Sequence, residues 1–405
     1  MFKNLVLSGS LTDAERQYLD RVAGLIPVLR DEAAAAEEGR KVTAPVMDAA
    51  VEAGLFSALV PARFGGQALG LRSLTEAARL LARGDASTAW ALAFLIEHNW
   101  MAGRMPIPVQ EKLFADRNYM LAAAPLVSGG PATREEDGSY RITGTWRYGT
   151  GYDNSDWVFV TCTIQEEDGP VDRVFMLPVD AVEVVQRWEA SGMAATSSHN
   201  LRGEDLIVPA ERSLPIPDFV SADSHGGIEH IESIYHYPLH FGLNNMMAGI
   251  FVGIAEAVLD LYEGKLESSR PFGLARKERT PSRIRWAAAR KRIEAARLLY
   301  FATIDWTVEL CEKREGYTQE DIGELQLSSL TIAHMCHDAV NQLCMGIGSS
   351  AFALKDPIQR YKRDIDVLIN HAGLDWDVVA DRASRWSLGF GAETTDWHSS
   401  PAKGK

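Results

Sequence analysis

Long stretches with helical periodicity in the second half of the chain constrain its fold most. The spacing of apolar residues predicts helices over about residues 238–268, 281–314 and 318–345, followed by shorter helices over 358–372 and 376–388. At 1.5 Å per residue, the first of these helices is roughly 45 Å long. Long helices joined by short loops pack side by side, so this half of the chain predicts a four-helix bundle.

The first half of the chain carries two other patterns. Residues 11 to about 118 predict a set of helices, the first of them capped by Thr12 and Asp13. From Tyr119 to about Leu214, short β-type runs alternate with turn residues, as in a small barrel or sandwich. We therefore expect a mostly helical protein with a central β domain. The expected domains are residues 1–118, 119–215 and 216–405.

Composition limits the class of protein and its partners. The chain has 405 residues, 46% of them hydrophobic and 24% charged, as in a soluble globular protein. Its net charge of −14 argues against binding to nucleic acids and to anionic membrane surfaces. No apolar run approaches a membrane span, and Met1 to Ser10 lacks the features of a signal peptide. The four cysteines form no C-x-x-C pair, so we expect a cytoplasmic protein without a zinc site.

Two histidines are candidate catalytic residues. The helix expected over 358–372 carries His371 near its end, two turns after Asp364 on the same side, where the imidazole can face a cleft. The helix expected over 86–103 carries His98 on a mainly apolar face. For each of them, the alternative is a histidine that serves only the packing of the core or the surface.

The order of the domains and several short motifs resemble the acyl-CoA dehydrogenase fold. That fold has an N-terminal helical domain, a small β barrel and a C-terminal four-helix bundle. The matching motifs are Val60-Pro61-Ala62-Arg63-Phe64-Gly65-Gly66, Gly144-Thr145-Trp146 with Asp156-Trp157-Val158, Arg270-Pro271-Phe272-Gly273 and Gln359-Arg360 with Arg363-Asp364.

The chain departs from the dehydrogenases where their catalytic carboxylate can lie. His371-Ala372-Gly373 stands there, so Ala372 replaces the acid. A histidine at this point instead resembles the oxygenase components of two-component flavin-dependent monooxygenases. Glu97-His98-Asn99 is similar to the helix that gives those enzymes a second histidine, and residues 192–199 are similar to their G-x-x-G-T-x-S loop, although Ala195 replaces a glycine.

This resemblance implies a reaction and its cofactors. The implied enzyme uses reduced flavin and O2, through a C4a-hydroperoxyflavin, to hydroxylate a phenol-like or polycyclic aromatic molecule. The resemblance favours FMNH2 over FADH2, a separate NAD(P)H:flavin reductase as partner, and a homotetramer. The alternatives are N-oxygenation of an amine or amino sugar, desaturation of an acyl-CoA, and a binding protein without catalysis.

The same resemblance assigns the site residues. His98 is expected to activate the substrate, and His371 to serve the peroxide or the substrate, although the two roles can be exchanged. The expected cofactor-binding residues are Trp146, Tyr148, Gly149, Thr150, Thr196, Ser198, Arg270 and Phe272. Ser198 is also a candidate catalytic residue. Trp146 can instead be a core residue, Ser198 a turn residue and Arg270 a surface charge.

A histidine-rich segment over 221–240 is a candidate wall of the substrate pocket, through His236, Tyr237 and Phe241. His236 and His240 also have a spacing that can hold a metal on a helix, but the H-E-x-x-H arrangement is absent. We therefore expect no metal, and a solvated linker is the remaining alternative.

Overall fold

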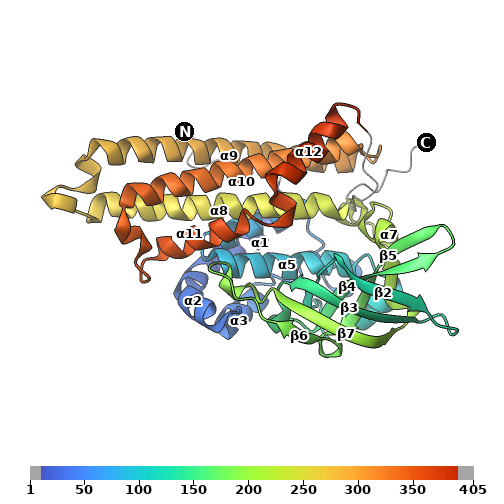
Figure 1. The fold of residues 1–405 in the computed structure, drawn as a ribbon. Helices are drawn as coiled ribbons and strands as arrows, with labels where there is room; N and C mark the ends of the chain where they lie inside the picture. Colours follow the sequence, from blue (N-terminus) through green and yellow to red (C-terminus); the bar gives the residue numbers. More distant parts are fainter. Residues whose placement is uncertain (1–10, 391–405) are drawn as a thin grey trace.

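The computed structural model shows the expected arrangement of helices around a central sheet. It describes residues 11–390 apart from the side chain of Phe272, so Met1 to Ser10 lies outside the described residues. The long helices of the second half form one layer, and the N-terminal helices and the β sheet pack together against one side of it (Figure 1). The predicted fold class, mostly α with a central β domain, is confirmed.

The N-terminal helices begin where the sequence supplies a cap. Thr12 Oγ1 accepts a hydrogen bond from Glu15 N at 3.2 Å, and Glu15 Oε2 accepts one from Thr12 N at 2.8 Å. The chain turns at Leu25, before Pro27, because proline lacks the N–H that a continuous helix would need. The helices are α1 (Asp13–Gly24), α2 (Ile26–Gly39), α3 (Ala44–Glu52), α4 (Leu71–Ala82), α5 (Ala86–Ala102) and α6 (Ile107–Leu113).

The strands form one sheet around a core of their own. They are β1 (Ala122–Ala123), β2 (Ser128–Arg134), β3 (Tyr140–Gly149), β4 (Trp157–Glu166), β5 (Gly169–Pro178), β6 (Glu183–Gln186), β7 (His199–Val208) and β8 (Ser213–Pro215). The pairing order is β6-β7-β3-β2-β4-β5-β8, with β1 beside β4. Within the described residues this path has two ends, so the barrel is open. Trp146, Ile142 and Phe175 fill its interior.

The second half forms the expected bundle. Its helices are α8 (Leu239–Ser268), α9 (Thr280–Glu312), α10 (Gln319–Ile347), α11 (Pro357–Leu368) and α12 (Trp376–Ser387). The short helix α7 (Ile216–Val220) precedes them and packs against β5 and β8. By length and composition, α8 could cross a membrane, so the expectation that no apolar run approaches a span is wrong. In the folded chain 89% of its apolar window is buried, as in the core helix of a soluble protein.

The expected helix over 358–372 is shorter than predicted. α11 ends at Leu368, and His371 has extended backbone angles of φ −62° and ψ 139°. His371 therefore lies outside the helix and begins the short 3-10 turn η11 (Ala372–Leu374). The two-turn relation between Asp364 and His371 is wrong for this reason.

The helical parts share one core, which changes the meaning of the predicted domains. One buried apolar cluster contains side chains of α4 and α5 together with side chains of α8, α9 and α10. The sheet has the second core. The division at residues 118 and 215 stays a prediction, but the N-terminal helices and the bundle pack as one body.

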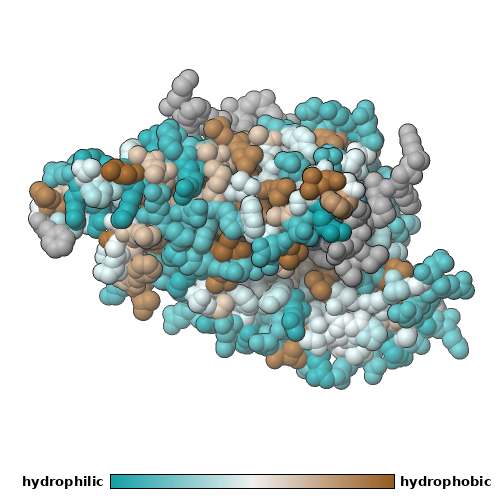
Figure 2. Space-filling view, turned by 45° about the horizontal axis from the view of Figure 1, so that its top comes forward, coloured by the Kyte–Doolittle hydropathy of each residue, from teal (hydrophilic) through white to brown (hydrophobic). Residues whose placement is uncertain are grey.

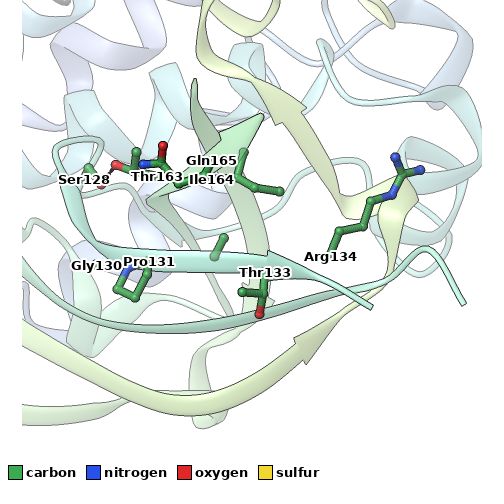
Figure 3. Close-up of a pocket in the computed structure, with 9 residues that line it drawn as sticks. Ser128, Gly130, Pro131, Thr133, Arg134, Thr163, Ile164 and Gln165 are labelled. Atoms are coloured by element: carbon green, nitrogen blue, oxygen red, sulfur yellow. Dashed lines mark hydrogen bonds between the residues drawn. The ribbon is translucent and has the colours of Figure 1, made fainter. Parts of the chain in front are cut away.

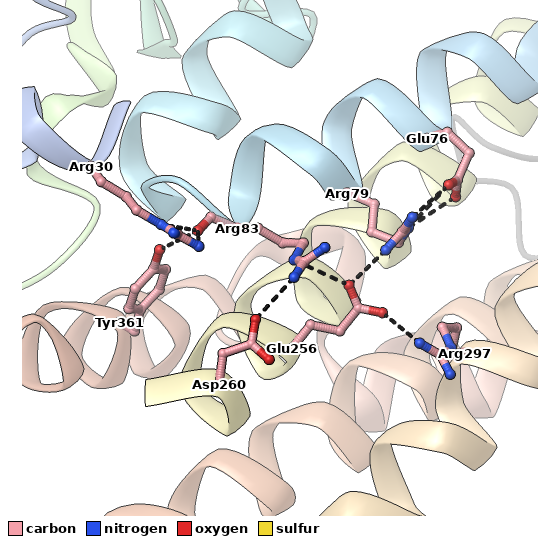
Figure 4. A network of polar contacts seen from close by, with 8 residues as sticks. All are labelled: Arg30, Glu76, Arg79, Arg83, Glu256, Asp260, Arg297 and Tyr361. Carbon is pink, nitrogen blue, oxygen red and sulfur yellow. Dashed lines mark hydrogen bonds and ion pairs between the residues drawn. The ribbon is translucent and has the colours of Figure 1, made fainter. Parts of the chain in front are cut away.

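A buried network of charges lies within that shared core (Figure 4). Glu256 on α8 accepts hydrogen bonds from Arg79 Nη1 at 2.6 Å and from Arg297 Nη1 at 3.2 Å. Arg79 on α4 also pairs with Glu76 at 2.8 Å. The side chain of Glu256 is only 9% exposed, so its charge depends on these two arginines and on Arg83, whose Nε lies 3.7 Å from Glu256 Oε2.

We predict that Glu256→Ala lowers the free energy of unfolding by about 3–5 kcal/mol, because it leaves Arg79 buried with less charge compensation. Asp260→Ala is the matched control on the same helix, since Asp260 pairs with Arg83 at 2.9 Å but is 51% exposed. Its expected effect is about 1 kcal/mol or less. Urea denaturation of the two variants measures both values, and equal losses would contradict the structural role of the network.

Candidate active site

A row of aromatic rings brings the two predicted histidines together. Trp90, Phe94 and His98 are spaced four residues apart on α5, so their side chains lie on one face. The ring centroids of Trp90 and Phe94 are 4.9 Å apart, and those of Phe94 and His98 are 5.6 Å apart. His371 packs edge-on against Trp90 at 5.4 Å. The two histidines therefore stand at opposite ends of one continuous row.

The surroundings of His98 fix its tautomer. Its Nδ1 lies 2.5 Å from the carbonyl oxygen of Ala122 in β1, and a carbonyl can only accept, so the proton is on Nδ1. Asn99 holds the neighbouring Met120 by donating to its carbonyl at 3.0 Å and accepting from its N–H at 2.8 Å. His98 Nε2 is buried and has no hydrogen-bond partner among the described residues. This nitrogen therefore carries a free lone pair that can accept a proton.

His371 has the opposite tautomer. Gly373 N donates to His371 Nδ1 at 3.1 Å, so Nδ1 carries no proton and Nε2 carries it. Burial lowers the pKa of His371 to about 4, and burial likewise lowers the pKa of His98 to about 4. Both rings are neutral at pH 7.

Three of the predicted hydroxyl and loop residues form a chain of hydrogen bonds. Thr196 Oγ1 donates to Met193 O at 2.9 Å, and Ser198 Oγ donates to Thr196 Oγ1 at 2.8 Å. Thr150 Oγ1 lies 2.9 Å from Ser198 Oγ. Because Ser198 already uses its proton, Thr150 is the donor of this last bond. This series of hydrogen bonds ends at Thr150, whose Oγ1 keeps its lone pairs free to accept.

The loop that carries these hydroxyls is held by two residues that the sequence did not single out as functional. Asp364 Oδ1 on α11 accepts from Met193 N at 2.5 Å, and Ser87 Oγ on α5 accepts from Ala195 N at 2.7 Å. A Cβ at Gly192 would lie 2.3 Å from the carbonyl oxygen of Arg363, so only glycine fits there. The signals for these anchors were the terminal Arg-Asp pair and the start of α5.

Tyr148 presents an aromatic face beside the hydroxyl chain. Its side chain is 58% exposed, and its backbone has φ 66°, in the left-handed region. The ring of Trp188, which the sequence did not single out, stands edge-on at 6.0 Å and donates its indole N–H to Met193 O at 2.9 Å. Next to Tyr148, a Cβ at Gly149 would come within 2.9 Å of Leu201. An exposed flat ring beside ordered hydroxyls fits a flat cofactor such as flavin.

Trp146 lies elsewhere. Its side chain is 1% exposed inside the sheet, and its indole N–H donates to Thr161 O at 2.7 Å. This placement favours the alternative that Trp146 is a core residue. The side chain of Phe272 is outside the described residues. Arg270 is exposed at the connection between α8 and α9, at the end of the bundle far from the sheet (Figure 1), so one chain does not bring it to Thr150.

The residues predicted to line the substrate pocket have protein partners. His236 Nε2 pairs with His230 O at 2.9 Å, and the hydroxyl of Tyr237 donates to Glu312 at 2.5 Å. Phe241 is fully buried against Tyr317. His236 ends the 3-10 turn η7 (Ser233–His236), before α8 begins, so the helical spacing to His240 is wrong. In the described range, no three His, Cys, Asp or Glu side chains gather as a metal site.

An open groove of about 610 Å³ runs along β2 and β4 (Figure 3). Its lining residues are Ser128, Gly130, Pro131, Ala132, Thr133, Arg134, Thr163, Ile164 and Gln165. None of these side chains can act as a general base at neutral pH. The groove can serve binding, whereas the histidine row carries the groups for proton transfer.

Comparison with known families agrees with the fold. Residues 12–107 match the model of the acyl-CoA dehydrogenase N-terminal domain, and residues 245–376 match that of the C-terminal domain. Together they span more than half of the chain. The chain belongs to the acyl-CoA dehydrogenase family.

Individual members of this family extend the comparison over nearly the whole length. The chain is 27% identical over 380 residues to a pigment production hydroxylase of a Rhodococcus species, covering 92% of this chain and 96% of the relative. It is 27% identical over 392 residues to the oxygenase component of an FADH2-dependent resorcinol hydroxylase of a Rhizobium species, covering 92% and 94%. The structure of XiaF from a Streptomyces species with FADH2 and glycerol superposes with a TM-score of 0.85 at 22% identity, covering 93% and 96%.

We predict that the Asp364 carboxyl makes stability depend on pH. Burial, and then the nearby Asp85, raise the pKa of Asp364 to about 8. The folded state therefore binds this proton more tightly than the unfolded state, and stability falls as the pH rises from about 4 to 8. Asp364→Asn keeps an acceptor for Met193 N and removes the titration, so its melting temperature should fall less over this range. Asp31→Asn, an exposed change on α2, should keep the wild-type slope, and parallel curves for all three proteins would contradict the prediction.

Proposed function

We propose that this chain is the oxygenase component of a two-component flavin-dependent monooxygenase that hydroxylates an aromatic small molecule. The observation that carries the proposal is the pair of neutral histidines with opposite tautomers at the ends of one aromatic row. The similarity to named hydroxylases over more than nine tenths of the chain supports it. Ala372 supplies no carboxylate at the position of the dehydrogenase base, which disfavours acyl-CoA desaturation.

Reduced flavin, when bound, supplies the two electrons that activate O2, so that one oxygen atom enters the substrate and the other leaves as water. Tyr148 and the chain of Thr150, Ser198 and Thr196 would hold it. The free lone pairs of Thr150 suit the ring N–H groups of a reduced flavin. Both FADH2 dependence and an FADH2 complex occur among the similar proteins, so the preference for FMNH2 stays a prediction to be tested beside FADH2.

In this proposal one histidine accepts a proton and the other donates a hydrogen bond. His98 Nε2 accepts a hydrogen bond from the phenol, since its lone pair is free and its Nδ1 proton is committed to Ala122 O. It takes the phenolic proton as the substrate reacts, when the phenolate that forms beside it supplies the charged partner that the imidazolium otherwise lacks. His371 donates a hydrogen bond from Nε2–H on the oxygen side. The aromatic row excludes water between them, which prevents loss of the reactive oxygen to solvent. A phenol fits this division better than an amine, because loss of its proton to His98 makes the aromatic ring a better nucleophile.

The partners follow from the same proposal. A chain that receives reduced flavin needs a separate NAD(P)H:flavin reductase. The Rhizobium relative is named as an oxygenase component, which implies such a partner for that protein. A homotetramer would bring Arg270 of another copy toward the flavin. Exposed apolar residues on the bundle support self-association, among them Ile284 at 62%, Met345 at 70% and Trp376 at 48%. Figure 2 shows such brown residues among teal ones over the helices. We propose a cytoplasmic location.

Rapid mixing tests the activity. The protein with reduced FMN or FADH2, prepared without oxygen, is mixed with oxygenated buffer and followed by absorbance. We expect a transient species distinct from reduced and oxidised flavin, and a hydroxylated product when a phenol is present. Reoxidation at the rate of free reduced flavin would overturn the proposal, and reduction of bound flavin by acyl-CoA thioesters would establish the dehydrogenase alternative.

We predict that His98→Asn lowers the rate of product formation by about 10²–10⁴-fold, the usual contribution of a general base. The asparagine amide can keep the bond to Ala122 O, while the Nε2 base is lost. The absorbance transient without phenol should persist, because His98 acts on the substrate. His225→Asn changes an exposed histidine and serves as the control. Unchanged product formation in His98→Asn would assign the proton transfer to another group.

A further inference from the structure

A second group of unpartnered polar atoms lies beside His98 and has no role in the proton transfer described above. Glu97 is fully buried on α5, and neither of its carboxylate oxygens has a hydrogen-bond partner among the described residues. Burial raises the pKa of Glu97 to about 8, with Arg104 opposing the shift. An unpaired buried acid costs stability, so its retention in the core calls for a ligand.

Glu97 borders the aromatic row on one side and α8 on the other. Phe94, the half-buried ring that touches both Trp90 and His98, precedes Glu97 by three residues and shares its side of α5. Trp100 follows by three residues and packs so closely on α8 that a Cβ at Gly242 would lie 2.3 Å from its ring. A molecule lying on Phe94 with its reacting end at His98 would therefore pass the Glu97 carboxyl.

A second unpartnered acceptor lies on the facing helix. α5 and α8 run antiparallel here, because Gly242 packs on Trp100 whereas Met247, later on α8, lies near Gly373 and the Trp90 end of the row. Asn245 lies between these two contacts on α8, as Glu97 lies between Trp90 and Trp100 on α5. Its amide nitrogen donates to Phe241 O at 2.9 Å and to Thr307 at 3.1 Å, and its Oδ1 is buried without a partner in the described part of the chain.

The neighbouring guanidinium of Arg104 does not donate hydrogen bonds to Glu97 or Asn245. Both terminal nitrogens of the Arg104 guanidinium donate to main-chain carbonyls, Nη1 to Phe219 O at 3.1 Å and Ser221 O at 2.5 Å, and Nη2 to Tyr237 O. Arg104 thus ties the entry to α8 onto the end of α5. The acceptors of Glu97 and Asn245 remain for groups that come from outside the chain.

We propose that Glu97, supported by Asn245, is a specificity-determining residue that accepts a hydrogen bond from a hydroxyl or amino substituent of the aromatic substrate, remote from the oxidised position. The proposal rests on the proposed monooxygenase function and adds its substrate class. A site built to bind a donor rejects an analogue that lacks it, because the buried acceptor is then left unpaired. A purely apolar pocket would show the opposite preference, since it must desolvate the substituent.

Two phenols that differ by one hydroxyl group test the proposal. The dissociation constants of 4-(2-hydroxyethyl)phenol and 4-ethylphenol are measured by anaerobic calorimetry on the protein loaded with reduced flavin. We expect the hydroxyethyl compound to bind at least about ten-fold more tightly to the wild type. Glu97→Leu should abolish or reverse this preference. Glu97→Gln should keep most of it, because the amide retains an acceptor of the same shape.

Several binding results would overturn the proposal. They are equal or weaker binding of the hydroxyethyl compound by the wild type, absence of binding by both phenols, and an unchanged preference in Glu97→Leu. Tightest binding of 4-hydroxyphenylacetate would also overturn it and indicate an anion site at Arg104. Glu111→Gln, an exposed change on α6, controls for general effects of losing a glutamate.

The flavin transient separates this proposal from the proposed function. Loss of the transient in the wild type would overturn the monooxygenase function itself. A normal transient together with no preference between the phenols would overturn only the role of Glu97.

Discussion

The site depends on the way in which one loop is held between two helices. The segment with Thr196 and Ser198 belongs to the sheet domain, yet its backbone N–H groups are fixed by Ser87 on α5 and Asp364 on α11. These two hydrogen bonds join all three parts of the chain at one point. The position of the hydroxyl chain relative to the histidine row therefore follows from the packing of the whole molecule. A buried acid at position 364 is tolerated there because it supplies this connection.

Burial of the two imidazoles against aromatic rings sets the chemistry of the histidine row. Trp90 packs against His371 and Phe94 packs against His98, and no acidic side chain of the described residues bonds to either ring. Burial without a counter-charge favours the neutral imidazole, which leaves each ring with one donor and one acceptor. The backbone then decides which nitrogen has which role, through the carbonyl of Ala122 and the N–H of Gly373. Two chemically identical side chains thus have opposite tautomers.

Much of this could be predicted from the sequence, and the failures have physical causes. The cap at Thr12 and the apolar face around His98 are local features, and both were predicted correctly. The end of α11 was predicted incorrectly. The three residues after Leu368 include no strong helix breaker, and tertiary packing decided where they turn. Trp146 was predicted beside the cofactor, but the alternation of β3 turns it into the sheet. The anchors Ser87 and Asp364 contact residues more than one hundred positions away in the sequence, so the Arg-Asp pair and the start of α5 marked their positions but not their partners.

The sequence by itself determined the elements, their order and the family, because periodicity, caps and short motifs are local properties of the chain. It also supplied the two histidines as candidates. Only the tertiary structure decided their tautomers, the direction of the hydroxyl chain and the isolation of Glu97. Each of these depends on which backbone group or side chain lies within about 3 Å of a given atom. Such distances arise from contacts between distant segments, so they appear only when the chain has folded.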